Sequence, residues 1–573
     1  MTIPTAATRR TALRRYPALL FVLVAGALAL ALPSGLNVPL SGPSTLAEYA
    51  PVPGPGEGAS DLSEVGSGSS GDLGFGSGRG GPGGLEAPQQ PGQLRARLKR
   101  CVGKPPRQTE DPLSPPCVAH FQGNNFGATS RGVTEDEVRI VIYLGLSPNQ
   151  RLFDIDDPNY TDPDAQTEQF LRLVRAYSRY FNDRYQTYQR RVHFYGYKGN
   201  GSTAPQIRAQ VEDILQKANP FAILPFGSGT ESQSMAREAA QRDIVVASYS
   251  AFDREFQQGV APFLLSYAPD LQDEAEISAS YVCRKLTGRP AVHSGNVRDR
   301  TRTRKFGIVF QRDASVPEHE RLKDLMVEQL LEQCNVTPLV REARTTNEGQ
   351  PDYGLGMAAM REAEVTTVIG MSSSTGPTFW GGPAGAQGYY PEWIIPGRSL
   401  AFGVDDNSNA RGYPAVFWSN AFGLTYDYRR GSTQSQRWYA AYREGCKDCP
   451  EPASNFLNAN LYDTLNLFFW GIQAAGPRLS PASMDKGLHA IPERRSTDPI
   501  VPAAYFEAGN YSWVKDGAEI WWDPAGEEPG SGLRGCYRMT NGGQRFRAGE
   551  WPEGDGDIKR TENAPCQGSV RGS

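Results

Sequence analysis

The stretch 221-FAILPFGSGTESQSMAREAAQRDIVVASYS-250 decides the fold class. An apolar run meets a small, Gly-rich turn, a helical pattern follows, and a second apolar run comes directly after the helix. Strand, turn, helix and strand in this order are typical of a parallel β-α-β unit. Backbone N–H groups at such a turn can hold an anion, so the turn is the first candidate binding site.

The same alternation of strands and helices continues on both sides of this unit. Upstream we expect strands at 137–146 and 191–198 and helices at 165–185 and 204–217. Downstream we expect further helices and strands at 271–286, 304–313, 317–334, 355–375 and 455–476. Two successive α/β sets predict two similar lobes, in which ligands bind beyond the carboxyl ends of the strands.

The N-terminal residues 1–32 are typical of an export signal. Arginines precede the uncharged run 17-PALLFVLVAGALALAL-32, and 29-ALA-31 offers a cleavage site. An uncleaved membrane anchor is the alternative, because the next charge is Glu48. We expect an exported chain, either secreted or anchored at the cell surface through residues 1–32. Residues 33–100 are rich in Gly, Pro and Ser and are expected to form a disordered linker.

The eight cysteines are an even number in an expected exported chain, which predicts disulfides. Their order suggests the local pairs Cys101–Cys117, Cys283–Cys334, Cys446–Cys449 and Cys536–Cys566. The C-x-x-C at Cys446 has two other interpretations, a redox motif and half of a zinc site. We expect no metal site, because a second C-x-x-C is missing and the five histidines show no ligand spacing.

Charge and motifs exclude several classes of function. The net charge is −4 and no basic field stands out, so nucleic acid is not the expected partner. The turn at 227–232 lacks both the third Gly of a dinucleotide fingerprint and the Lys of a P-loop. The sequence contains neither G-x-S-x-G nor H-E-x-x-H. We therefore expect no cofactor, no catalytic residue and no enzyme; a C-x-x-C oxidoreductase is the alternative.

Four stretches occur in an order and spacing that carry a family resemblance. They are 132-GVTEDEVRIVIY-143, 222-AILPFGSGTESQSMAREAAQRDIVVAS-248, 366-TTVIGMSSSTGPTFW-380 with 388-GYYPEW-393, and 461-LYDTLNLFFWGIQAAG-476. Together they resemble the type I periplasmic solute-binding proteins, in the branched-chain amino acid (Leu/Ile/Val-binding) branch that serves ABC importers. The resemblance covers about residues 132–550.

The resemblance implies a two-lobed α/β fold with parallel sheets flanked by helices and three hinge crossovers. The expected division is an extension tied by a disulfide at 101–135, a first lobe from 136–267 and 400–525, and a second lobe from 268–399. Residues 526–573 are expected to return to the second lobe and end in a tail.

The resemblance also implies a ligand site at the strand ends of the first lobe. Gly227 and Gly229 would let a ligand carboxylate approach the backbone, and Ser228 would add a hydroxyl. The alternative for Ser228 is a helix cap. The next strand ends at Ser248 and Tyr249, which would supply a second hydroxyl and an aromatic wall.

Four further ligand contacts are expected. Three come from the second lobe, and one comes from the stretch where the chain returns to the first lobe. Ser373 and Ser374 stand where the family often has an aromatic residue, and Trp380 follows them. Trp380 has core packing as its alternative role. Asp405, in 401-AFGVDDNSN-409, falls on the acidic position that would pair with a ligand ammonium; a solvated turn is the alternative.

The implied function is capture of a small polar solute, such as an amino acid or amide, by closure of the lobes. The expected partners are this small-molecule ligand and the subunits of an ABC permease. A surface sensor of the same fold, anchored in the membrane by residues 1–32, is the alternative.

Overall fold

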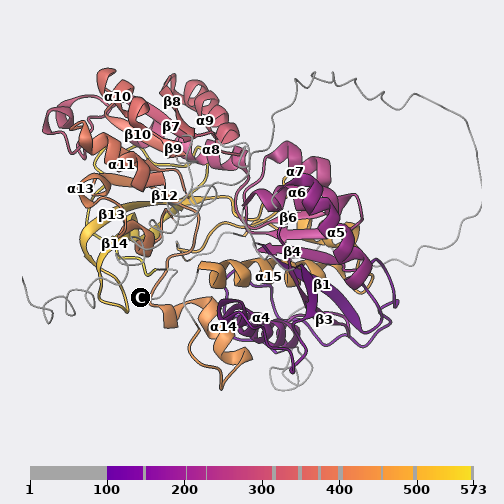
Figure 1. Cartoon of the computed structure of the whole chain (residues 1–573). Coiled ribbons are helices and arrows are strands. Elements are labelled where there is room, and N and C mark those ends of the chain that lie inside the picture. Colours follow the sequence, from indigo (N-terminus) through magenta and orange to yellow (C-terminus); the bar gives the residue numbers. More distant parts are fainter. Residues whose placement is uncertain are drawn as a thin grey trace, which may run out of the picture. The chain divides into compact units, whose positions relative to one another are not determined.

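The computed structural model describes residues 100–569, apart from the gaps 146–149, 202, 227–228, 313–317, 346–350, 372–375, 398–403, 453–455, 495–497 and 499. The described chain forms two β-sheets, each covered by helices (Figure 1). We call them the first and second sheet, and each sheet with its helices a lobe. Among the described residues, no helix combines the length and apolar character needed to cross a bilayer.

The first sheet has six strands, of which only β2 is antiparallel to its neighbour. Its order is β2 (Arg151–Asp154), β3 (Arg191–Lys198), β1 (Glu137–Leu144), β4 (Ala222–Phe226), β5 (Val245–Ser248) and β6 (Leu264–Ser266). The strand and helix expected from the opening stretch are confirmed as β4, α6 and β5, and β4 pairs in parallel with β5.

Alternation along β1 explains how this sheet is covered on both faces. Val138, Ile140 and Ile142 face one core, whereas Val141 and Tyr143 face another. The helices that cover the first lobe are α4 (Ala165–Arg184), α5 (Ala204–Ala218), α6 (Gly229–Ala240), α7 (Arg254–Val260), α14 (Arg437–Gly445), α15 (Phe456–Ala475) and α16 (Pro481–His489). In Figure 1, α14 and α15 lie beside α4, although more than 250 residues separate them from it in the sequence.

The second sheet joins parallel strands to an antiparallel edge. Its order is β14 (Arg534–Met539), β13 (Gly517–Glu527), β12 (Ala421–Thr425), β11 (Glu392–Ile395), β10 (Thr367–Met371), β7 (Phe306–Gln311), β8 (Leu339–Thr345) and β9 (Pro351–Asp352), with β15 (Arg545–Phe546) paired to β13. Its α-helices are α8 (Leu271–Tyr281), α9 (Glu318–Cys334), α10 (Gly354–Glu362), α11 (Gly376–Ala386), α12 (Asn407–Ala410) and α13 (Ala415–Trp418).

Short turns of π- or 3₁₀-helix complete the described elements. They are η1 (Val282–Leu286), η2 (Val297–Thr301), η3 (Thr433–Ser435) and η4 (Thr540–Gly543).

The described chain passes between the two sheets three times, as expected from the sequence. Crossover 1 spans 267–270, between β6 and α8. Crossover 2 spans 426–436, between β12 and α14, and crossover 3 spans 513–516, before β13. The residues that enter crossover 3 lie against β6, because Ser512 bridges in parallel to Ser266.

The positions of crossovers 2 and 3 correct the expected lobe boundaries. Residues 400–525 were assigned to the first lobe, but β12 pairs in parallel with β11 and β13 pairs antiparallel to β12. Both strands therefore belong to the second sheet. The physical reason is that their buried backbones find hydrogen-bond partners at the free edge of β11. Only 437–516, with α14, α15 and α16, returns to the first lobe.

Three of the four expected disulfides are present: Cys283–Cys334, Cys446–Cys449 and Cys536–Cys566. The fourth expected pair is corrected, because Cys101 and Cys117 are both free thiols. They lie close enough for a hydrogen bond between their side chains. The strand-like bridges of Arg107 to Val102 and to Pro116 bring them together, so the extension is held by backbone pairing rather than by a sulfur–sulfur bond.

Candidate functional site

The carboxyl ends of β4 and β5 lie where the sequence predicts a ligand site. Gly227 and Ser228 lie outside the described residues, and α6 begins at Gly229, so the predicted carboxylate contacts of this turn remain predictions. Ser248 is only 2% exposed. Its Oγ accepts a hydrogen bond from the Ser250 N–H at 3.1 Å, which makes it a turn-forming residue at the end of β5.

Tyr249 connects the end of β5 to two of the crossovers. Its ring stacks on that of Tyr267 in crossover 1, with the ring centroids 5.1 Å apart. Its hydroxyl donates a hydrogen bond to the Asp427 carboxylate in crossover 2, at 2.5 Å. Tyr249 therefore lies at the carboxyl end of β5 against crossovers 1 and 2, and its role as an aromatic wall for a ligand stays a prediction.

Asp427 is paired in turn with Arg430, and this pair reaches the predicted residue Asp405. The Arg430 guanidinium donates to the Asp427 carboxylate at 2.7 Å and to the Asp405 backbone carbonyl at 2.7 Å. The Asp405 carboxylate accepts a hydrogen bond from the Thr425 hydroxyl at 2.6 Å and is fully buried. Burial contradicts the alternative of a solvated turn, since Asp405 anchors the start of crossover 2 inside the protein, and its expected contact with a ligand ammonium stays a prediction.

A cavity of about 370 Å³ lies beside crossover 2. Its walls come from residues 427–431, from the first turn of α14 with the residues before it, from the first turns of α15, and from Asp498, Ile500 and Val501. Glu110 and Pro112 of the N-terminal extension complete the lining. Tyr428, Trp438 and Tyr462 make it strongly aromatic. Asp427, which accepts the Tyr249 hydrogen bond, is one of its charged residues, so the cavity adjoins the predicted strand-end site.

The charged centre of the cavity lining is Arg437, which lies between two aspartates. Its guanidinium forms ion pairs with Asp111 and, at 3.0 Å, with Asp463. The same guanidinium lies 3.5 Å from the centroid of the Tyr428 ring, in a cation–π contact. Burial lowers the pKa of Arg437, but the two carboxylates outweigh it and raise the pKa above its ordinary value. A fifth of the side chain remains exposed on the cavity side of the cluster.

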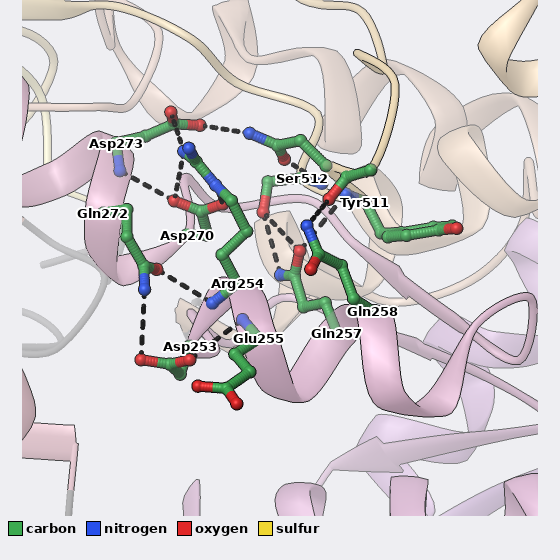
Figure 2. A network of polar contacts seen from close by, with 12 residues as sticks. Asp253, Arg254, Glu255, Gln257, Gln258, Asp270, Gln272, Asp273, Tyr511 and Ser512 are labelled. Carbon is green, nitrogen blue, oxygen red and sulfur yellow. Dashed lines mark hydrogen bonds and ion pairs between the residues drawn. The ribbon is translucent and has the colours of Figure 1, made fainter.

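A second polar network joins crossovers 1 and 3 (Figure 2). Arg254, the first residue of α7, forms ion pairs with Asp270 at 2.7 Å and with Asp273 at 2.5 Å. Asp273 also pairs with Lys515 at 2.9 Å and accepts a hydrogen bond from the Asn510 side chain at 3.0 Å. This network therefore ties α7 and α8 to the chain that enters β13.

Other contacts in Figure 2 fix the same region further. The Gln257 side chain donates to the Ser512 hydroxyl at 2.9 Å, and the Gln272 side chain donates to Asp253 at 3.1 Å. Asp253 also pairs with Arg321 of α9 at 2.6 Å, so this ion pair joins the first lobe to the second. Burial and the charge of Asp273 raise the pKa of Asp270 in spite of its contact with Arg254.

Of the residues expected from the second lobe, the structure describes only Trp380, which does not line the cavity. Ser373 and Ser374 lie outside the described residues, so their ligand contacts remain predictions. Trp380 is 1% exposed, and its ring stacks on Trp393 with a centroid distance of 5.4 Å. It also fills the space above Gly370, where an added Cβ would lie only 1.9 Å from the indole. The expectation for Trp380 is corrected: it packs in the core of the second lobe.

Sequence reasoning missed most of the cavity residues. Tyr462 and Asp463 are in the stretch 461-LYDTL, which carried the family resemblance without being assigned to the site. Their place at the start of a long helix was the available signal, because that end of an α/β helix lies at the carboxyl edge of the sheet. Asp111 and Arg437 gave no such signal. In the described part of the chain, no cluster of three or more His, Cys, Asp or Glu residues is arranged to hold a metal ion.

Comparison with known proteins identifies the fold. No protein-family profile matches the sequence, and no curated protein does so either. A solute-binding protein of an ABC transporter from Rhodopseudomonas palustris, solved in complex with 4-hydroxybenzoate, has a TM-score of 0.50 and 11% identity over 74% of this chain and 100% of its own.

Two further solved structures are similar at slightly lower scores. A periplasmic binding protein from Burkholderia mallei has a TM-score of 0.49 and 11% identity, covering 74% of this chain and 100% of its own. A fatty acid ABC transporter substrate-binding protein from Thermomonospora curvata has a TM-score of 0.48 and 13% identity, covering 75% and 96%. The similarity to the R. palustris structure, together with the sheet topology, shows the α/β fold of type I periplasmic binding proteins, with mostly parallel sheets flanked by helices.

Proposed function

We propose that the chain is an extracytoplasmic solute-binding protein that captures a small polar solute and delivers it to an ABC importer. The observation that supports this most is the cavity beside crossover 2, which Tyr249 connects to the carboxyl end of β5. Ligands of open α/β sheets bind at this edge, and pockets for small molecules combine apolar walls with a few convergent polar groups. Here three aromatic rings and the polar side chains of Asp427, Arg437 and Asp463 supply both.

The solute proposed from the sequence is an amino acid or an amide. A cavity of about 370 Å³ is at the small end of the range for ligand pockets, which agrees with a solute of this size. The aromatic walls also suit an aromatic acid, and the R. palustris neighbour holds 4-hydroxybenzoate. The turn at 227–229, together with Ser373 and Ser374, remains our proposal for further contacts of the bound solute.

Capture would work by closure of the two lobes about the three crossovers. A ligand that contacts both lobes favours the closed arrangement by its extra affinity for that arrangement. The closed surface is then the one that an ABC permease subunit would recognise, which makes permease subunits the proposed partners.

Isothermal titration against L-leucine, L-glutamine, other amino acids and amides, and 4-hydroxybenzoate tests the proposed function. We expect one solute class to bind, and small-angle scattering to show a more compact protein when it does. Heat signals indistinguishable from buffer for the whole panel, with scattering unchanged, would rule out this proposal. The Arg298→Gln variant is a suitable control, because the Arg298 side chain is 75% exposed and does not line the cavity.

We propose that the C-x-x-C pair has a structural role and that the chain is not an enzyme. Cys446 and Cys449 form a disulfide at the end of α14, and both pack against the core of the first lobe. A Cys446→Ser variant with unchanged solute binding would support this role. Loss of a thiol-dependent activity in that variant would instead favour the oxidoreductase alternative.

The place of the protein at the cell surface is also a proposal, since 1–32 lies outside the described residues. N-terminal sequencing of the mature protein separates the alternatives. A start near residue 32 favours a secreted binding protein, whereas an intact N-terminus favours a membrane-anchored binding protein or sensor.

A further inference from the structure

The N-terminal extension reaches the cavity through a loop at 107–117 that is inserted deeply into the first lobe. Gln108, Thr109 and Ser114 are fully buried, and Asp111 is 1% exposed. Arg184 of α4 donates to the Gln108 carbonyl at 3.2 Å, and Arg494 donates to the Ser114 carbonyl at 3.0 Å. The loop is therefore held from two sides, and Asp111 lies at its innermost part.

Asp111 accepts hydrogen bonds from three separate elements of the first lobe. The Tyr428 hydroxyl of crossover 2 donates to one carboxylate oxygen at 2.7 Å. The Arg437 guanidinium of α14 and the Asn466 amide of α15, the latter at 3.3 Å, donate to the other. The N–H of Leu113 closes the loop onto the same carboxylate at 2.8 Å. A buried carboxylate with this many donors is strongly fixed in position.

Two of these donors belong to the cavity. Tyr428 and Arg437 lie within the segment 427–440, which forms one cavity wall, and both line the cavity. The neighbours of Asp111 in the chain, Glu110 and Pro112, line it directly. Glu110 is itself held by Arg184 at 3.2 Å. The loop thus fixes one wall of the cavity through Asp111 and supplies part of another.

We infer that Asp111 is a positioning residue for the solute cavity, and that the N-terminal extension is part of the binding site rather than a passive linker. This inference rests on the proposed function, because it takes the cavity as the place of the solute. Its physical basis is charge: without the Asp111 carboxylate, Arg437 keeps Asp463 but loses the partner that holds its other amino group. The guanidinium and the Tyr428 ring stacked on it then move, and the wall changes shape.

A merely structural role of the extension predicts a different result, and a matched variant separates the two. Asn125 lies in the same extension and is 4% exposed. Its amide donates to the carbonyl oxygens of Glu135 at 2.7 Å and Tyr188 at 3.0 Å, and it does not line the cavity. Asn125→Ala therefore loosens the extension, whereas Asp111→Asn keeps the side-chain shape, removes the charge beside Arg437 and replaces one acceptor oxygen by an NH2 donor.

Hydrogen exchange of the full chain without ligand is the first test. We expect Asp111→Asn to speed amide exchange across 428–440, and Asn125→Ala to leave that segment as in the wild type. Equal exchange across 428–440 in the wild type and Asp111→Asn would overturn the inference, whichever solute the protein binds.

Titration with L-leucine, L-glutamine and 4-hydroxybenzoate is the second test. For the probe that binds the wild type, we expect Asp111→Asn to weaken binding about tenfold or more, as expected when a charge-assisted hydrogen bond is lost. Asn125→Ala should stay within about twofold. The effects of Asp111→Asn and Arg437→Gln should not add in the double variant, because both act on one ion pair. Unchanged binding by Asp111→Asn would overturn the inference and leave the proposed function intact.

Discussion

Two arginines of the first lobe, Arg254 and Arg437, are each the first residue of a helix and each lie between two aspartates. Around Arg254, the carboxylates are also engaged by Lys515 and by neighbouring amides, and the network of Figure 2 does not line the cavity beside crossover 2. Around Arg437, one side of the cluster faces a cavity of about 370 Å³ with aromatic walls.

An arginine between two aspartates can therefore have different roles, depending on whether the cluster adjoins a cavity. The ion pairs of Arg254 join residues 16 and 19 positions apart, and Asp273 extends the cluster to Lys515, 242 positions away, where crossovers 1 and 3 meet. The Arg437 cluster joins the extension to α14 across 326 positions. Both clusters therefore join segments that are distant in the sequence, and of the two arginines only Arg437 lines the cavity. We therefore assign stability to the first cluster and solute binding to the second.

Replacing Arg437 should have the largest effect, because it leaves two buried carboxylates without their common partner. We expect Arg437→Gln to lower the free energy of unfolding by about 3 kcal/mol and to weaken solute binding by at least about tenfold. Denaturant unfolding and isothermal titration measure the two effects. Wild-type solute affinity in Arg437→Gln would contradict the assignment of this cluster to solute binding, since Arg437 would then have the same structural role as Arg254.

The matched change at the other cluster should affect stability alone. We expect Arg254→Gln to lower the free energy of unfolding by about 2 kcal/mol, somewhat less because Arg254 is 29% exposed and Lys515 still pairs with Asp273. Solute affinity should change by less than about twofold. A loss of affinity as large as that of Arg437→Gln would show that the network of Figure 2 acts on the binding site.

A smaller effect is expected where the strand end meets the cavity. Tyr249→Phe removes the hydroxyl that donates to Asp427 and keeps the ring stacked on Tyr267. We expect a cost of about 1 kcal/mol in unfolding and a several-fold loss of affinity. Tyr505→Phe is a control that loses a hydroxyl bonded to Glu507 outside the cavity. Equal solute affinity in Tyr249→Phe and Tyr505→Phe would show that the Tyr249 hydroxyl at the end of β5 does not affect solute binding in the cavity.

The smallest effect should come from the ion pair between the lobes. Arg321 is 45% exposed and Asp253 is 17% exposed, so Arg321→Ala should cost about 0.5 kcal/mol or less at pH 7. Burial raises the pKa of Asp253, but Arg321 and the Glu255 N–H outweigh it and lower the pKa. A lowered carboxyl pKa stabilises the fold above the ordinary pKa and loses this contribution as the pH falls below about 4.

The difference between wild type and Arg321→Ala in unfolding should therefore shrink between pH 6 and pH 2. High salt should reduce it at every pH, because exposed charges are screened. A difference that grows in acid would contradict the assignment of this pair.

Much of the fold could be predicted from the sequence, because periodicity depends on local chemistry. The apolar alternation that predicted 191–198 appears as β3, and the helix expected at 165–185 appears as α4. The strands β12 and β13 were assigned to the wrong lobe. Pairing of β13 antiparallel to β12 depends on which sheet edge is free, and a strand's own residues do not record that.

The site was less predictable than the fold. Tyr249 was expected as an aromatic wall, and it does contact both Tyr267 and Asp427. Asp405 was expected to face a ligand; burial beside Thr425 gives it an anchoring role, and its contact with a ligand stays a prediction. Asp111 lies in a Pro-rich stretch without periodicity, and its importance arises only from contacts with residues more than 300 positions away.

A crystal structure of the protein with the solute identified by titration would show directly whether the cavity beside crossover 2 binds the solute. We predict electron density for the solute in the cavity beside crossover 2, against Tyr428 and Trp438 and within reach of Arg437. Density for the solute elsewhere, with this cavity free of it, would contradict the assignment of the Arg437 cluster to solute binding.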